Sequence, residues 1–101
     1  MVSIRGFQNI MRRIYFQRDS KRGTEGTYKW LKEEVDELGE AIVEANMEAL
    51  AGEFADVAAW LASLANLLKL DLETVLLQKY GSGCPKCSSI PCKCSFIARK
   101  S

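Results

Sequence analysis

Two pairs of carboxylates are the side chains of this 101-residue chain that are best spaced for metal chemistry. Glu34 and Glu37 form one pair, and Glu53 and Asp56 form the other. Residues three apart on a helix have Cβ atoms about 5 to 6 Å apart, so each pair could hold a cation jointly. Four such charges in one pocket would repel one another, and a hard divalent cation with oxygen ligands, Mg²⁺ first and Mn²⁺ second, would relieve that repulsion.

The chain contains no histidine, and this absence limits its other chemistry. Histidine general bases, Ser-His triads and histidine metal ligands are excluded. A carboxylate-bridged di-iron bundle is disfavoured as well, because such sites use Glu-x-x-His ligands. Carboxylates and thiols are the groups that remain for demanding chemistry.

All four cysteines lie within eleven residues near the C-terminus, in the order C-x2-C-x4-C-x-C: Cys84, Cys87, Cys92 and Cys94. Thiolates at this spacing could close a tetrahedral zinc site, and free or redox-active thiols are the alternative. A closed four-thiolate site leaves no open position for substrate. We therefore expect Zn²⁺ to be structural and to supplement a small core.

The pattern of apolar residues predicts four helices that would position these groups. They cover about residues 4–18, 27–45, 47–68 and 71–80, with a break over residues 18–26, which are rich in glycine and short polar residues. A chain of this length has room for one core. We predict an all-α fold, an antiparallel helical bundle completed by oligomerisation, with residues 1–80 as the helical domain and residues 81–101 as a small cysteine-rich zinc knuckle and tail.

The two carboxylate pairs have the same position relative to the apolar stripe of their helices. With Leu31 or Leu50 set at 0°, the pairs fall at about 300° and 240° on each helical wheel. An antiparallel hairpin that packs through its apolar stripes would bring both pairs to one side, beside Trp30 and Trp60. The alternatives are that the acids form solvated helix faces and that the tryptophans serve only in packing or subunit contacts.

Charge is distributed in three blocks although the net charge is +1. Residues 1–32 and 79–101 are basic, whereas residues 33–78 hold eleven acids and one lysine. An acidic block of this kind calls for cations or basic partners. The longest uncharged stretch is too short for a membrane span, and the N-terminus lacks the features of a secretory signal, so we expect a cytoplasmic protein without membrane partners.

Residues 30–42 and 50–57, with Asp71 to Glu73 and Lys79-Tyr80, resemble the MazG-like nucleotide pyrophosphohydrolases of the all-α NTP pyrophosphatase superfamily. The hallmark of this superfamily is an ExxE motif followed by an ExxD motif, and the four carboxylates occupy those positions. The resemblance covers about residues 4–94, because small members of this type carry an arginine-rich head and a cysteine-rich tail.

The resemblance implies hydrolysis of a nucleoside triphosphate to the monophosphate and pyrophosphate, with Mg²⁺ held by the four carboxylates as the catalytic site. It also implies a homodimer or homotetramer. Candidate substrate contacts are Lys79 and Tyr80, which match a Lys-Tyr position of the family, and Arg22, Lys29 and Trp30. For the basic residues, ordinary solubilising charge is the alternative.

The substrate remains open at this point among dUTP, phosphoribosyl-ATP and damaged or noncanonical nucleotides, so one possible role is the clearing of noncanonical nucleotides. The alternative to an enzyme is a helical module that binds nucleic acid or protein through its zinc knuckle. Only Phe96 could stack on a base there, which makes nucleic acid an unlikely partner.

Overall fold

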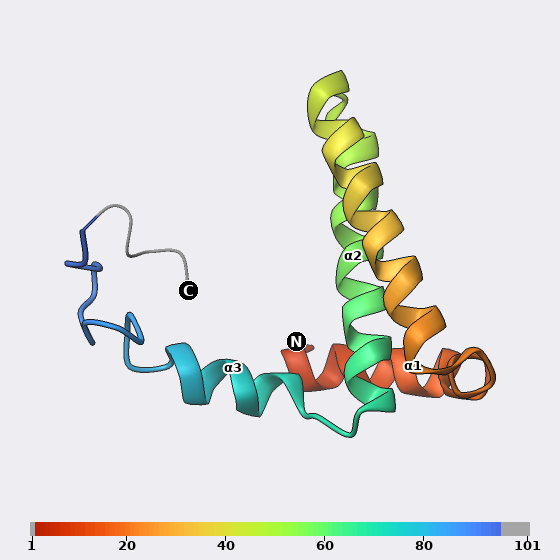
Figure 1. Cartoon of the computed structure of the whole chain (residues 1–101), viewed down its shortest axis with the longest axis horizontal. Coiled ribbons are helices and arrows are strands. Elements are labelled where there is room, and N and C mark those ends of the chain that lie inside the picture. Colours follow the sequence, from red (N-terminus) through yellow and green to blue (C-terminus); the bar gives the residue numbers. More distant parts are fainter. Residues whose placement is uncertain (1, 96–101) are drawn as a thin grey trace.

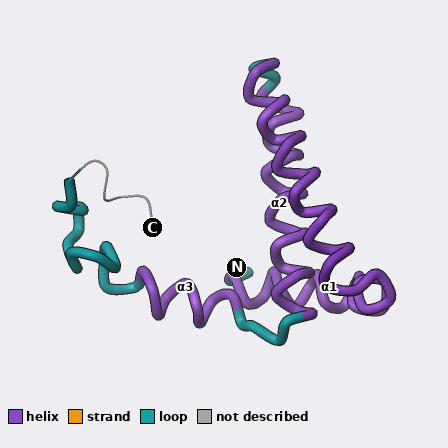
Figure 2. Tube along the Cα trace, viewed as in Figure 1, coloured by secondary structure: helices purple, strands orange, loops and turns teal. Residues whose placement is uncertain are grey.

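The computed structural model describes residues 2–95, which fold into three α-helices without strands (Figures 1 and 2). Helix α1 covers Ile4–Glu44, α2 covers Met47–Leu67 and α3 covers Leu72–Tyr80. The all-α prediction is confirmed. No helix in this part of the chain has the length and apolar character that crossing a membrane requires.

Short polar side chains begin each helix. Ser3, Asn46 and Asp71 each accept a hydrogen bond from the backbone N–H three residues later, which satisfies one of the free donors at the helix start. Helix α1 ends at Ala45, which takes the left-handed conformation with φ 56°. Because only two residues separate α1 from α2, the second half of α1 runs antiparallel to α2 as predicted (Figure 1).

The predicted break over residues 18–26 is wrong in extent, because a single residue makes it. Gly23 has φ 83° and ψ 171°, and helical structure continues on both sides of it within α1. Glycine adopts a positive φ without steric cost, so one residue is enough to turn the chain. The two halves of α1, residues 4–22 and 24–44, therefore point in different directions (Figure 1).

Polar side chains hold this bend in place of a loop. Arg22 Nη1 donates to Asp19 Oδ1 at 2.8 Å and to Thr27 Oγ1 at 3.4 Å, so it bridges the two halves of α1 across Gly23. Both partners are buried, Asp19 at 2% exposure and Thr27 at 0%. The glycine and polar residues that predicted a loop instead form a compact internal network.

The hairpin packs through a face that is rotated from the predicted one. Several side chains of the predicted apolar stripes are exposed: Val35 and Ile42 of α1, and Phe54 and Leu61 of α2. The buried or half-buried side includes Glu34 and Ala41 of α1 and Glu53 and Trp60 of α2. The packing face is thus rotated toward the flank that carries Glu34 and Glu53, while Leu31 and Leu50 of the stripes remain half-buried. The prediction that the hairpin packs on its apolar stripes is corrected to this extent.

A buried polar pair joins the first half of α1 to the end of α2. Gln8 Nε2 donates to Asn66 Oδ1 at 3.0 Å, and Asn66 Nδ2 donates to the carbonyl of Gln8 at 3.1 Å. Gln8 also accepts from the N–H of Leu72 and donates to the carbonyl of Leu70, which fixes the loop before α3. Since each of these groups is paired, burial of two amides at this crossing is tolerated.

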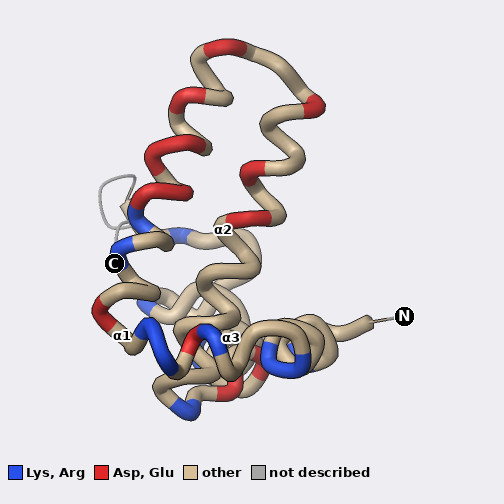
Figure 3. The backbone as a smooth tube through the Cα atoms, turned by 90° about the vertical axis from the view of Figure 1, so that its right-hand side faces the viewer, with Lys and Arg blue, Asp and Glu red and all other residues tan. Residues whose placement is uncertain are grey.

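Acidic residues follow both arms of the hairpin, whereas lysines and arginines gather around its base (Figure 3). One ion-pair cluster ties the N-terminal end of α1 to α3: Arg5 contacts Asp71 at 2.9 Å and Glu73 at 2.8 Å. Apart from Asp71 and Glu73, the acidic block predicted from sequence therefore lies on the α1–α2 hairpin.

Candidate functional site

Three of the four predicted carboxylates meet between α1 and α2. Glu34 and Glu37 of α1 and Glu53 of α2 each place a carboxylate oxygen within 4.8 Å of the others. Asp56 is not in this group, but it lies one turn beyond Glu53 on α2 and its charge acts on Glu34. Three of the four predicted carboxylates are thus brought together, and Asp56 lies outside their group.

Two oxygens of this cluster are buried without a hydrogen-bond donor among the described residues: Glu34 Oε2 and Glu53 Oε2. A buried carboxylate oxygen without a partner carries a large desolvation cost. A divalent cation would give both oxygens a partner, and carboxylate oxygens are the donors that Mg²⁺ and Mn²⁺ prefer. The cluster therefore fits a hard divalent cation.

Electrostatics within the cluster are repulsive. Burial raises the pKa of Glu34 to about 7, and the hydrogen bond with Glu37 and the charges of Glu37, Asp56 and Glu53 add to the rise. In the absence of a cation the repulsion is relieved by a proton on Glu34 near neutral pH. A proton on Glu34 would thus compete with a metal ion bound at this cluster.

An aromatic pair flanks the carboxylates. The rings of Trp30 and Trp60 stack with centroids 6.0 Å apart and an interplanar angle of 17°. The guanidinium of Arg22 lies over the ring of Trp60, 4.7 Å from its centroid. Arg22 is thereby held by an ion pair, a hydrogen bond and a ring contact, which fixes the wall of the site next to the cluster.

A cavity of about 200 Å³ adjoins the cluster on the side of this aromatic pair. Its walls include Tyr15, Arg18, Asp19, Arg22, Asp56 and Trp60. Asp56, the fourth predicted carboxylate, lines this cavity and lies one helical turn from Glu53, so the cavity begins next to the cluster. Tyr15 and Asp19 are site residues that were not predicted from the sequence, although Tyr15, Arg18, Asp19 and Arg22 have the i, i+3, i+4, i+7 spacing of one helix face.

Three of the predicted substrate contacts, Lys29, Lys79 and Tyr80, lie apart from the carboxylate cluster within the single chain. Lys29 is exposed and lines a shallow outer depression of α1. Lys79 and Tyr80 end α3, which extends away from the hairpin, and the Lys79 Nζ is 5.6 Å from the Tyr80 ring centroid (Figure 1). Arg22 and Trp30 are the two candidates that lie beside the carboxylates.

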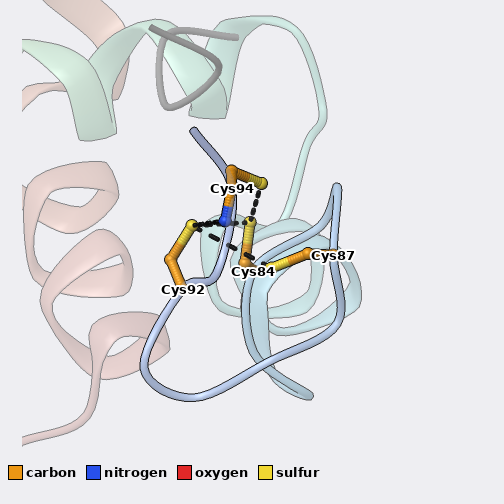
Figure 4. A group of neighbouring side chains, drawn as sticks. All are labelled: Cys84, Cys87, Cys92 and Cys94. Carbon is orange, nitrogen blue, oxygen red and sulfur yellow. Dashed lines mark hydrogen bonds between the residues drawn. The ribbon is translucent and has the colours of Figure 1, made fainter. Parts of the chain in front are cut away.

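The four cysteines come together after α3 (Figure 4). Their sulfurs lie within 4.8 Å of one another. The Sγ–Sγ distances are 3.8 Å for Cys84–Cys94, 3.9 Å for Cys87–Cys92 and 3.6 Å for Cys84–Cys92. A tetrahedron of thiolates around Zn²⁺ with Zn–S bonds of about 2.3 Å has edges of about 3.8 Å, so these distances fit such a site.

Backbone donors favour thiolates in this cluster. The N–H groups of Lys93 and Ser89 lower the pKa of Cys87 to about 6, and similar bonds lower the pKa of Cys84. In contrast, a hydrogen bond to Cys92 raises the pKa of Cys94 to about 12. Metal ions bind thiolates, not thiols. A metal ion at this cluster would therefore displace the protons that the neighbouring thiols share.

A comparison with protein families identifies one match. The family model of the MazG nucleotide pyrophosphohydrolase domain matches residues 22–88, which include all four predicted carboxylates. No curated protein matches the chain. Because the family match covers well over half of the sequence, and the helical fold agrees with it, the chain belongs to the MazG nucleotide pyrophosphohydrolase family.

Proposed function

We propose that this protein is a Mg²⁺-dependent nucleoside triphosphate pyrophosphohydrolase, which converts a nucleoside triphosphate and water into the monophosphate and pyrophosphate. The observation that carries this proposal is the group of three carboxylates between α1 and α2, two of which have a buried oxygen without a partner among the described residues. Family membership supports a hydrolase that acts on nucleotides.

Glu34, Glu37 and Glu53 would hold the metal, and Asp56 would complete the ligand set at the edge of the cluster. When bound, a divalent cation neutralises the triphosphate and lowers the pKa of water at the α-phosphorus, so no protein nucleophile is needed. This chemistry suits a chain without histidine. Arg22 and Trp30 are the substrate contacts that lie beside the cluster, and Lys29, Lys79 and Tyr80 remain predicted contacts.

The proposal is tested by product analysis. The purified protein is incubated with a panel of canonical and noncanonical nucleoside triphosphates, with and without Mg²⁺, and the products are resolved by chromatography. Monophosphate and pyrophosphate that form only with Mg²⁺ support the proposal. Diphosphate and phosphate as products, or no turnover of any nucleotide, contradict it.

We propose further that the protein is a homodimer or homotetramer. Apolar side chains on the exposed half of the hairpin support this assembly: Val35, Ile42, Phe54 and Leu61. A second copy that covers them would bury the surface that one copy leaves in water. Light scattering should give a multiple of the 11.3 kDa chain mass, and Phe54→Glu should lower that mass. Val43→Glu, at an exposed apolar position off this stripe, should not.

A structural Zn²⁺ at the four cysteines is the remaining proposal about the chain's cofactors. The three Sγ–Sγ distances and the backbone N–H bonds to sulfur support it. The cysteines follow the end of α3 at Tyr80, which supports the proposed boundary between a helical domain over residues 1–80 and a zinc knuckle over residues 81–101. Residues 96–101, which include Phe96, lie outside the described part of the chain. Metal analysis of the purified protein should give about one zinc per chain.

A further inference from the structure

One buried carboxylate near the site lies outside the group of Glu34, Glu37 and Glu53. Asp19 is 2% exposed and lines the 200 Å³ cavity beside the cluster. Its Oδ1 accepts from Arg22, but its Oδ2 is buried and has no donor within residues 2–95. A buried acceptor without a donor is costly, and its position on a cavity wall means that a ligand could supply the missing N–H.

The charges around the cavity indicate which part of a nucleotide would lie there. Arg18 and Arg22 contribute two positive charges, and Asp19 and Asp56 contribute two negative ones. A phosphate in the cavity would lie near the unpaired Oδ2 of Asp19. Both groups are hydrogen-bond acceptors, so their contact would be unfavourable. The balanced charge and the unpaired acceptor favour an uncharged group with N–H donors, which describes a nucleobase.

The position of the cavity along α2 agrees with this interpretation. Trp60 and Ser63 line the cavity and lie four and seven residues beyond Asp56. At a rise of 1.5 Å per residue they are about 6 and 10 Å further along the helix axis. A triphosphate bound at the carboxylates would place its ribose across this interval and its base in the cavity.

We propose that this cavity binds the nucleobase and that Asp19 is its specificity-determining residue. Oδ2 accepts a hydrogen bond from the exocyclic amino group of a cytosine-type or adenine-type base. An ionised carboxylate only accepts hydrogen bonds. A base with a carbonyl at that position, as in uracil or hypoxanthine, would place a second acceptor against Oδ2 and would be disfavoured. This inference rests on the proposed function, since it names the base selected by the same site.

The surroundings of Asp19 are suited to this role. Arg22 donates to Oδ1 at 2.8 Å and is itself held by Thr27 and the ring of Trp60. The unpaired Oδ2 is therefore held in one place before a ligand binds. Asp19 precedes residues 22–88, which match the family model, so the family match does not assign this residue.

The test compares two pairs of nucleotides that differ only in this amino group, CTP with UTP and ATP with ITP. The wild-type protein should have the higher kcat/KM for CTP and for ATP. Asp19→Asn can place an NH₂ group at the position of Oδ2. The ratio of kcat/KM for CTP to that for UTP should therefore fall by about tenfold or more while pyrophosphate is still formed. Glu25→Gln removes one charge at an exposed position of α1 and should leave both the rates and the ratio unchanged.

A binding measurement separates this inference from the proposed function. Calorimetry of CMP and UMP without metal should show tighter binding of CMP, and Asp19→Asn should remove that preference while thermal unfolding shows a folded protein. Equal binding of CMP and UMP to the wild-type protein, or an Asp19→Asn variant that weakens both equally, would overturn the inference. If no triphosphate is hydrolysed, the proposed function fails, and the CMP and UMP result alone decides the role of Asp19.

Discussion

The carboxylate cluster and the cysteine cluster are both candidate metal sites, but they are built in opposite ways. Glu34, Glu37 and Glu53 come from two long helices and are brought together by the packing of α1 on α2. The four cysteines come from one short segment after α3, and their sulfurs are brought together by turns of that segment (Figure 4). One site is positioned by the fold, and the other is positioned by local backbone.

A metal ion would therefore stabilise the two sites for different reasons. At the carboxylates, helices hold like charges together and leave two buried oxygens unpaired, so a cation would relieve a repulsion that the fold has already created. At the cysteines, backbone N–H groups donate to sulfur, and a metal would fix the shape of a segment that has no helix of its own. We expect the first metal to matter for activity and the second for local order.

The largest effect should come from Glu53→Gln. The change keeps the shape of the side chain but removes one charge and one strong metal ligand, so kcat/KM for nucleoside triphosphate hydrolysis should fall by about 100-fold or more. Thermal unfolding without metal should be unchanged or shifted upward, because a repulsive charge is lost. Steady-state kinetics and circular dichroism measure the two effects.

Glu40→Gln is the matched control for this prediction. Glu40 is an exposed residue of α1, so its loss should change hydrolysis by less than about twofold. Full activity of Glu53→Gln would contradict the assignment of the metal site, and so would an equal loss in both variants.

The second prediction concerns pH. Glu34 has a pKa of about 7 in the metal-free protein, raised chiefly by burial, and a proton there competes with the cation. Mg²⁺ affinity should therefore rise from pH 6 to pH 8 and, well below pH 7, fall by up to about tenfold per pH unit. Calorimetric titration at several pH values measures this, and an affinity that is constant over this range would contradict it.

The same pKa fixes the sign of the stability change without metal. A carboxyl group whose pKa is raised on folding stabilises the folded state at low pH, and this contribution is lost as the pH rises from about 4.5 to about 7. The metal-free protein should thus unfold at a lower temperature at pH 8 than at pH 5. Glu34→Gln should remove this part of the pH dependence.

The helical elements and the carboxylate site could be predicted from sequence because they depend on periodicity. Apolar residues at helical spacing defined α2 and α3 almost to the residue, and the common offset of the two acidic pairs placed them on one side. The rotation of the packing face, which leaves Val35 and Phe54 exposed, could not be predicted, since it depends on contacts between residues of α1 and α2 that lie far apart in the sequence.

Buried polar pairs were the other feature that the sequence did not reveal. Asp19 and Thr27 look like turn residues beside Gly23, and only their contacts with Arg22 make them part of a packed bend. A single glycine then breaks the helix where composition predicted a loop. Pairing between distant polar groups leaves no periodic signal, because each partner alone is an ordinary surface residue.

The third prediction tests one of these polar pairs. Gln8→Leu removes the amide that pairs with Asn66 and with the N–H of Leu72, and it leaves those buried groups without partners. The free energy of unfolding should fall by about 1 to 3 kcal/mol. Chemical denaturation measures it. Asn9→Leu, at the exposed neighbouring position, is the control and should change it by less than about 0.5 kcal/mol.

The smallest effect on the helices should come from loss of zinc, and this prediction sharpens the comparison of the two sites. The hydrogen bonds of the cysteines remain within residues 84–94, so Cys87→Ser should release that segment without loosening the hairpin. Trypsin should then cut after Lys86 and Lys93 faster than in the wild-type protein, while hydrolysis stays within about twofold. A fall in helix stability as large as that of Gln8→Leu would contradict this view, because it would mean that the knuckle supports the same core that positions the carboxylates.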